Sequence, residues 1–209
     1  MAVIAALKSN LDLKKIFSVI PRLSPVEGRF EKVGKIKNKS LVFLDYAHTP
    51  DALQTCILNI REQFSDKHIS VLFGCGGDRD KGKRSKMGKI ADNYADKIYL
   101  TDDNPRHERP KKIRDEIKRG IKKRQIIEIS NRKEAIVKAI NNLNTGDILI
   151  VAGKGHEKIQ QIGNRKVFLS DRQIILNSIK KKNFNLSKNL KLNIFNERFD
   201  QNVLSSKSA

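Results

Sequence analysis

The stretch HISVLFGCGGDRDKGKRSKMGKIADNYADKIYLTDDNPR, residues 68–106, holds two short apolar runs separated by a segment with helical spacing. HISVLFG (68–74) predicts a buried strand, RSKMGKIADNYA (84–95) a helix and KIYLTD (97–102) a second strand. A strand, a crossover helix and a second strand form a βαβ unit with parallel strands. This unit decides the fold class, because the pattern repeats on both sides of it.

Three more short apolar runs predict strands, namely SLVFLDY (40–46), IIEIS (126–130) and ILIVAG (148–153). Segments with helical spacing lie between them, one beginning at Pro110 and one capped by Ser130 or Asn131. Five strands that alternate with helices predict an α/β fold, with a Rossmann-like, mostly parallel sheet and helices on both faces.

The domain expected from this pattern covers residues 28–182, with a small hairpin at 163–164 and a closing helix near 171–181. Residues 1–27 hold one amphipathic helical stretch and a loop with two prolines, which is too little for a domain. Residues 183–209 are rich in Asn, Lys and Ser, and this composition predicts a basic, disordered tail. A docking segment that orders on a partner is the alternative for the tail.

The net charge of +20 raises the question of nucleic-acid binding, because a basic surface is the electrostatic signature of phosphate binding. The basic residues are spread over several segments, Trp is absent and aromatic residues are 6% of the chain. No zinc-finger, basic-zipper or RNA-recognition pattern occurs. Nucleic-acid binding is therefore the less favoured alternative.

Composition also bounds the location of the chain. No apolar run approaches the roughly 20 residues of a membrane span, and the N-terminus lacks the pattern of a signal peptide. Two cysteines can form neither a disulfide framework nor a four-ligand metal site. We expect a cytoplasmic protein without contact with a membrane.

Unusual polar residues follow every predicted strand. In open α/β sheets, ligands bind outside the carboxyl ends of the strands. The segments at these ends are DYAHTPD (45–51), GCGGDRDKGKR (74–84), DDNPR (102–106), SNR (130–132) and GKGHE (153–157). Their concentration at one edge of the sheet predicts a ligand site there.

Three arginines in these segments, Arg79, Arg84 and Arg106, offer the planar fork that suits carboxylates. The glycines of 74–77 would let backbone N–H groups approach a phosphate or carboxylate, unless they only form a tight turn. Glu157 could hold a ligand ammonium group or pair internally with a lysine. The segments therefore predict a ligand with both carboxylate and amino groups, but no particular reaction.

The histidines do not predict a metal site. His48 and His156 lack ligand spacing and a third ligand nearby. His48 could cap the following helix or contact a nucleotide, whereas His68 and His107 are expected to be solvated.

Four motifs, DYAHTPDAL (45–53), FGCGGDRDKGKR (73–84), TDDNPR (101–106) and VAGKGHE (151–157), occur in the order in which the Mur ligases carry them. Residues 1–181 resemble the end of a Mur ligase, mainly its C-terminal domain. The resemblance implies an ATP-dependent ligase that forms an amide bond in peptidoglycan synthesis. In that family ATP converts the carboxylate of UDP-N-acetylmuramoyl-L-Ala-D-Glu to an acyl phosphate, which an incoming amine attacks. DNPR marks the members that use meso-diaminopimelate rather than lysine.

By the same resemblance, the diaminopimelate site consists of Arg79, Asp103, Asn104, Pro105, Arg106, Gly153 and Glu157. Asn104 and Arg106 would hold the distal carboxylate end, and Glu157 would face the ammonium group. The nucleotide contacts would be Asp45, His48 and Arg29, the last reaching an ATP phosphate.

The phosphate loop GTxGKT of the family, its modified lysine and its Mg²⁺ ligands have no counterpart in these 209 residues. Residues 1–27 resemble only the last helix of the family's central domain. ATP and Mg²⁺ are thus the expected cofactors, but no complete catalytic set and no metal site are expected in this sequence. An apolar face around Ile4, Leu7, Ile16 and Ile20 would be left uncovered without the central domain.

Two interpretations remain. The chain is part of a ligase, with a separate chain as the source of the N-terminal and central domains, or it is a non-catalytic domain that binds an amino acid. The complete set of amino-acid contacts favours the first.

Overall fold

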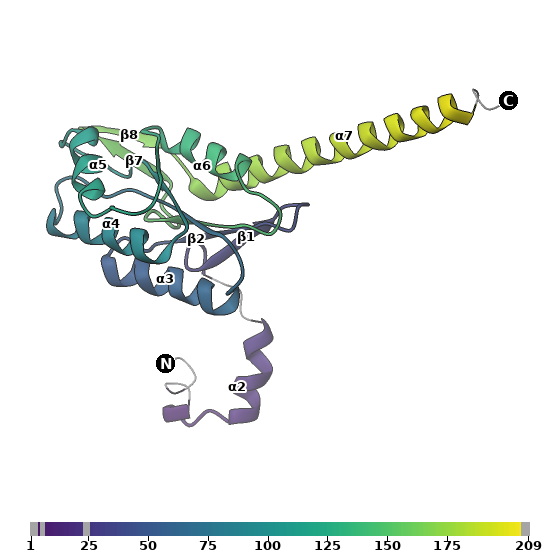
Figure 1. Cartoon of the computed structure of the whole chain (residues 1–209). Coiled ribbons are helices and arrows are strands. Elements are labelled where there is room, and N and C mark those ends of the chain that lie inside the picture. Colours follow the sequence, from purple (N-terminus) through teal and green to yellow (C-terminus); the bar gives the residue numbers. More distant parts are fainter. Residues whose placement is uncertain (1–3, 5–6, 23–25, 206–209) are drawn as a thin grey trace.

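The computed structural model describes residues 4, 7–22 and 26–205, with side chains to residue 188. A six-stranded sheet in the order β1-β2-β6-β3-β4-β5 forms its centre (Figure 1). The strands are β1 Glu31–Lys35, β2 Leu41–Asp45, β3 Ile69–Phe73, β4 Lys97–Leu100, β5 Ile126–Glu128 and β6 Ile148–Ala152. The five predicted strands, β2 to β6, are parallel.

Strand β1 was not predicted. It pairs antiparallel with β2 at the edge of the sheet, with Glu31 opposite Leu44 and Lys35 opposite Leu41. Its sequence EKVGK holds no apolar run, because an edge strand is only half covered and commonly carries charged residues. Residues 31–35 form a strand because they pair with β2, and their own sequence does not favour a strand.

Helices cover both faces of the sheet, as predicted. Helices α3 Pro50–Gln63, α4 Gly82–Tyr94 and α5 Pro110–Lys118 share one apolar cluster with the strands. Helix α6 Arg132–Asn141 and the first part of α7 Asp171–Ser205 share the other. The helices that follow β2, β3 and β4 therefore cover one face of the sheet, and α6, which leads into β6, covers the other. This arrangement confirms the Rossmann-like fold.

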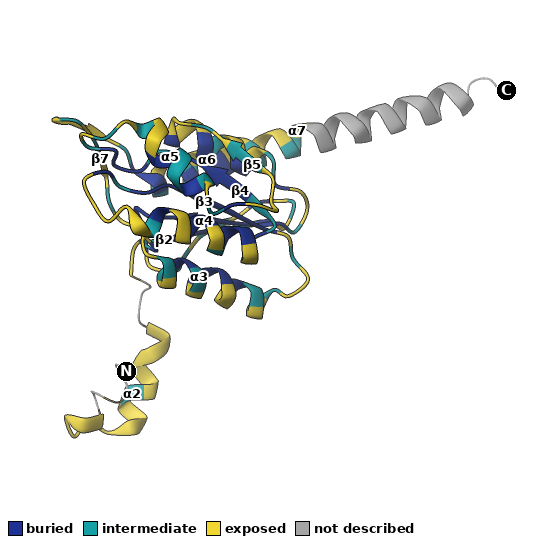
Figure 2. Cartoon of the chain, turned by 60° about the vertical axis from the view of Figure 1, so that its left-hand side comes forward, coloured by how far each residue is buried: buried dark blue, intermediate teal, exposed yellow. Residues whose placement is uncertain are grey.

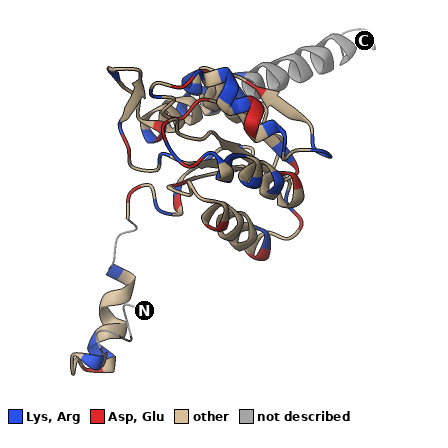
Figure 3. Ribbon diagram, turned by 90° about the vertical axis from the view of Figure 1, so that its left-hand side faces the viewer, with Lys and Arg blue, Asp and Glu red and all other residues tan. Residues whose placement is uncertain are grey.

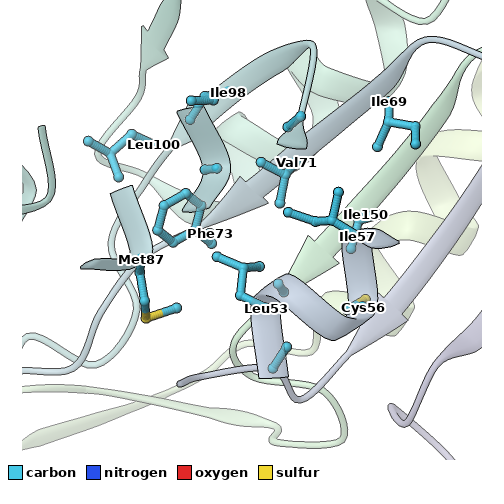
Figure 4. Close-up of a cluster of buried hydrophobic side chains, with 14 of the residues drawn as sticks. Leu53, Cys56, Ile57, Ile69, Val71, Phe73, Met87, Ile98, Leu100 and Ile150 are labelled. Atoms are coloured by element: carbon cyan, nitrogen blue, oxygen red, sulfur yellow. The ribbon is translucent and has the colours of Figure 1, made fainter. Parts of the chain in front are cut away.

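The two clusters follow the alternation of side chains along the strands. In β3, Val71 and Phe73 lie in the first cluster, with Leu53 of α3 and Met87 of α4 (Figure 4). Leu72 lies in the second cluster. All five residues of β3 are buried, as in other strands covered on both faces (Figure 2).

Helix α7 differs from expectation in its length. The closing helix predicted near 171–181 continues to Ser205, where composition predicted disorder from residue 183. No Gly or Pro follows Gly163, so no residue breaks the helix. The backbone N–H of Lys37 donates to Asn183 Oδ1 at 2.7 Å, and Leu186 packs against the second cluster.

The predicted hairpin is present as β7 Ile159–Ile162 and β8 Arg165–Phe168, which pair antiparallel. Gly163 provides the left-handed turn residue, with φ of +56°. The Nε2 of Gln160 donates to the carbonyl oxygen of Asp103 at 2.6 Å, so the hairpin is tied to the loop after β4.

The N-terminal segment contains α2 Leu13–Val19 and a 3-10 turn Ile20–Arg22, and it lies apart from the sheet (Figure 1). Of the apolar face expected here, Ile4, Leu7 and Ile20 are exposed and Ile16 is half-buried. Part of the predicted loop, including Pro25, falls outside the described residues.

Lys and Arg residues are interspersed with Asp and Glu residues along the helices and loops (Figure 3). On α5, for example, Lys111 and Lys118 both contact Asp115 within 2.8 Å. None of the helices in the described residues is both long and apolar enough to cross a membrane.

Candidate functional site

A cavity of about 430 Å³ lies at the carboxyl edge of the sheet, where the loops after β2, β3, β4 and β6 meet. Six of the seven residues predicted to bind the amino acid line it, namely Arg79, Asp103, Asn104, Arg106, Gly153 and Glu157. Pro105 is buried, with its carbonyl oxygen close to Gly77. The loops that the sequence singled out thus form one site.

Glu157 forms the acidic side of the cavity. Its Oε1 accepts from the Tyr46 hydroxyl at 3.2 Å, and its Oε2 accepts from Asn104 Nδ2 at 3.1 Å and Lys154 Nζ at 3.2 Å. Burial opposes ionisation, but the Lys154 charge and the three hydrogen bonds outweigh it and hold the pKa of Glu157 below its ordinary value. Glu157 is therefore a carboxylate at neutral pH and can bind a cationic group.

Asp103 lies beside it as a second, largely buried carboxyl group. Its Oδ1 accepts from the backbone N–H of Asn104 at 2.7 Å. Its Oδ2 lies 2.8 Å from the position that a Cβ at Gly153 would occupy, and Gly153 has φ of +111°. Only glycine fits at residue 153, which explains its presence between the two acidic groups.

Arg79, Lys83 and Arg106 form the basic side. Arg106 Nη1 donates to the carbonyl oxygen of Gly77 at 2.8 Å, and it lies 2.8 Å from the position of a Cβ at Gly76. The glycines of the loop after β3 thus let the Arg106 guanidinium approach the backbone. A ligand with an ammonium group and a carboxylate finds both negatively and positively charged side chains in this cavity, whose lining also includes Asp80.

Arg84 does not belong to this basic side, and its prediction as an anion-binding residue is wrong. Its side chain is fully buried, and Nη1 donates to Glu108 Oε2 at 2.9 Å and Glu116 Oε2 at 2.6 Å. The hydrogen bond from Arg84 is the main reason that the pKa of Glu108 falls to about 2. Arg84 also donates to the carbonyl oxygen of Gly76 at 3.1 Å, and this hydrogen bond fixes the loop after β3 from its buried side.

The predicted nucleotide contacts gather around Tyr46. The Arg29 guanidinium lies 4.4 Å from the centre of the Tyr46 ring, and the His48 ring lies 4.5 Å from it. Asp45 is directed elsewhere, because its carboxylate accepts from the backbone N–H groups of Phe30 and Ala47 at 2.6 and 2.8 Å. Asp45 therefore shapes this loop, whereas Arg29 and His48 are exposed and available to a ligand.

Sequence reasoning missed Tyr46 and Lys154, both of which bond to Glu157. Each lies within a motif that was singled out, but neither has a spacing that marks it as functional. His107 also differs from expectation. Although exposed, it bridges Asp78 Oδ2 at 2.7 Å and Asn164 Oδ1 at 3.0 Å.

These residues do not by themselves form a triphosphate or Mg²⁺ site. In the described part of the chain, no group of three His, Cys, Asp or Glu side chains could hold a metal ion. With Asp45 engaged by backbone N–H groups, Arg29 and His48 are too few to hold ATP phosphates. We therefore derive no catalytic step through ATP from this site.

Known proteins share this architecture. The chain is 48% identical over 167 residues to a UDP-N-acetylmuramoyl-L-alanyl-D-glutamate–2,6-diaminopimelate ligase of Rickettsia felis, a match that covers 79% of this chain and 31% of the relative. The ligase of the same name from Rhizobium meliloti is 48% identical over 166 residues, covering 79% and 34%. The chain thus spans about a third of the length of these relatives.

A solved structure of a ligase with this name matches with a TM-score of 0.70 and 36% identity, covering 87% of this chain and 37% of that one. The family model for the glutamate ligase domain of Mur ligases matches residues 28–155. This range contains the six-stranded sheet and every residue that lines the cavity except Glu157. The chain belongs to the Mur ligase family.

Proposed function

We propose that this chain is the amino-acid-binding part of a cytoplasmic ligase that adds meso-diaminopimelate to UDP-N-acetylmuramoyl-L-Ala-D-Glu in peptidoglycan synthesis. The observation that carries the proposal is that Asp103 and Glu157 line the same cavity as Arg79 and Arg106. The names of the relatives support it, since they name both the UDP-linked peptide and diaminopimelate.

meso-Diaminopimelate carries an amino group and a carboxylate at each end, whereas lysine lacks the second carboxylate. One ammonium group of diaminopimelate would lie against Glu157 and Asp103. The distal carboxylate would lie against Asn104 and Arg106, because an arginine fork binds a carboxylate in two parallel hydrogen bonds. Discrimination between the two amino acids then depends on the basic side of the cavity.

In the reaction, the residues of this chain would bind the amino acid and orient its reacting amine toward the activated carboxylate. Fixing one reactant in this way can supply several kcal/mol of the barrier reduction, or roughly 7–11 kcal/mol in the best-oriented intramolecular models. ATP and Mg²⁺ would supply the activation of the carboxylate, in a part of the ligase that carries the phosphate loop. Arg29 and His48 would then face the nucleotide.

Calorimetric titration of the chain with meso-diaminopimelate and, as a matched control, with L-lysine tests the proposal. We expect weak binding that favours meso-diaminopimelate. Equal affinities for the two amino acids would contradict the assignment of the distal carboxylate to Arg106. No binding of either would contradict the site.

A further inference from the structure

Lys154 places its ammonium group beneath the cavity, with none of its side chain exposed. Lysine is seldom fully buried unless its charge is paired and its donors are satisfied. Nζ donates to the carbonyl oxygen of Ile159 at 2.6 Å, to Asn104 Oδ1 at 3.2 Å and to Glu157 Oε2 at 3.2 Å. Two of these three acceptors belong to residues of the proposed amino-acid site.

The contact with Asn104 determines which way its carboxamide points. Oδ1 accepts from Lys154 Nζ at 3.2 Å and from the backbone N–H of Gln161 at 3.0 Å. Both partners are donors only, so the opposite orientation would place an NH₂ group against two N–H donors. The amide nitrogen of Asn104 is therefore directed to Glu157 Oε2.

The contact of Lys154 with Glu157 places a positive charge 3.2 Å from the Glu157 carboxylate. In the described part of the chain, Glu157 interacts with Lys154 of its own loop, Tyr46 directly after β2 and Arg132 of α6. The other charged side chains that line the same cavity are Arg79, Asp80, Lys83, Asp103 and Arg106. Of all these groups, only Lys154 forms an ion pair with Glu157. Without that charge, a half-buried carboxyl group would favour its neutral form.

We propose that Lys154 is a positioning residue for the amino-acid ligand, which fixes the carboxamide of Asn104 and, by its ion pair, holds the Glu157 carboxylate in place to receive an ammonium group. The proposal rests on the proposed function. It adds that Lys154, which does not line the cavity, determines how the binding residues Asn104 and Glu157 are arranged.

The first test needs no ligand. Lys154→Met removes the charge and all three hydrogen bonds but keeps most of the side-chain volume. In carbon-detected NMR titrations, we expect the pKa of the Glu157 carboxyl to rise by about one to three units, the usual effect of losing an adjacent opposite charge. Lys158→Met, at an exposed lysine of the same loop, is the matched control and should leave this pKa unchanged.

The second test measures calorimetric binding of meso-diaminopimelate between pH 5 and pH 8. The unchanged chain should bind with level affinity down to pH 6. Lys154→Met should bind about tenfold more weakly at pH 7, which corresponds to about 1.4 kcal/mol, and should weaken further as the pH falls through the raised pKa of Glu157. A merely structural lysine would lower the affinity equally at every pH.

If Lys154→Met does not fold, Lys154→Gln provides the same two measurements, because it removes the charge but keeps N–H donors that can bond to part of the buried acceptor set. An unchanged Glu157 pKa in a folded variant, or a pH profile parallel to that of the unchanged chain, would overturn the proposal. If the unchanged chain binds no diaminopimelate, the proposed function fails, while the Glu157 titration still tests the role of Lys154.

Discussion

Arg106 is the residue on which the specificity of the proposed site depends most. Its φ of +49° is unusual for a residue other than glycine, and such strain is often found at functional sites. The backbone is held there from the hairpin side, since Arg106 N–H donates to the Gln161 carbonyl at 3.1 Å and Gly163 N–H donates to the Arg106 carbonyl at 2.6 Å. The side chain is thereby fixed at the cavity wall.

Arg106→Lys tests this role, because it keeps the charge and the backbone strain but replaces a fork by a single ammonium group. We expect about tenfold weaker calorimetric binding of meso-diaminopimelate, as for the loss of one charge-assisted hydrogen bond, and a nearly unchanged melting temperature. Arg109→Lys, at an exposed arginine three residues further on, is the control and should bind normally. If both variants bind meso-diaminopimelate with equal affinity, Arg106 does not take part in binding.

His107 forms a pH-dependent contact between the loop after β3 and the turn of the hairpin. Its hydrogen bonds to Asn164 and Asp78 raise its pKa above the ordinary value of about 6.5. The stability that this contact contributes is therefore fully present at a pH below the ordinary pKa of histidine. It is lost as the pH rises through the raised pKa of His107. A proton NMR titration should show the pKa of His107 above its ordinary value, and Asp78→Asn should lower this pKa. A titration at the ordinary value in the unchanged chain would show that these contacts do not form.

At the scale of single residues, the motifs located most of the cavity wall, but arginine geometry alone favoured Arg79 and Arg84 alike, whereas the family resemblance assigned only Arg79 to the site. Both lie in the same loop sequence, and only packing decides that Arg84 is enclosed with Glu108 and Glu116. Lys154 was missed for the same reason, since its function depends on burial beneath the loop.

At the scale of elements, a buried ion pair joins α6, β6 and α7 beneath the cavity. Arg132 Nη2 donates to Asp171 Oδ2 at 2.7 Å and to the carbonyl oxygen of Ala152 at 2.9 Å. Both side chains of the pair are fully buried. The end of β6, immediately before Gly153, is therefore held by the Arg132 guanidinium of α6, which Asp171 of α7 holds in turn.

Asp171→Asn should destabilise the chain strongly, because it leaves the Arg132 charge buried without its counter-ion. Breaking such pairs commonly costs about 3–5 kcal/mol, and an isosteric amide would fall toward the lower end. The control is Arg172→Gln, which removes a partly exposed pair with Glu31 and should cost less than about 1 kcal/mol. Urea unfolding measures both, and equal losses would show that the buried pair has no special role.

The predicted strands and helices agree with the structure where apolar runs are long enough to be buried on both sides, as in β3 and β6. Prediction fails where a neighbour supplies the stabilisation, as for the edge strand β1. It also fails for the length of α7, because composition alone does not report that Asn183 and Leu186 contact the body of the domain.

At the scale of the whole molecule, the N-terminal segment exposes apolar residues, and the chain spans about a third of the length of the relatives it matches. Supplying the N-terminal and central domains of such a ligase as a second chain should give an amide product with ATP, Mg²⁺, UDP-N-acetylmuramoyl-L-Ala-D-Glu and diaminopimelate. A mixture containing Glu157→Gln is the control and should give far less product. Binding of diaminopimelate without any product would favour the non-catalytic interpretation.

Amide NMR spectra recorded during titration with meso-diaminopimelate show where on the chain this amino acid binds. If it binds in the cavity at the carboxyl edge of the sheet, we expect shifts confined to the loops 74–79, 103–106 and 153–157, with those around Arg106 absent when L-lysine is added. Shifts centred elsewhere, such as the groove of about 420 Å³ between α6 and α7, would contradict binding in this cavity.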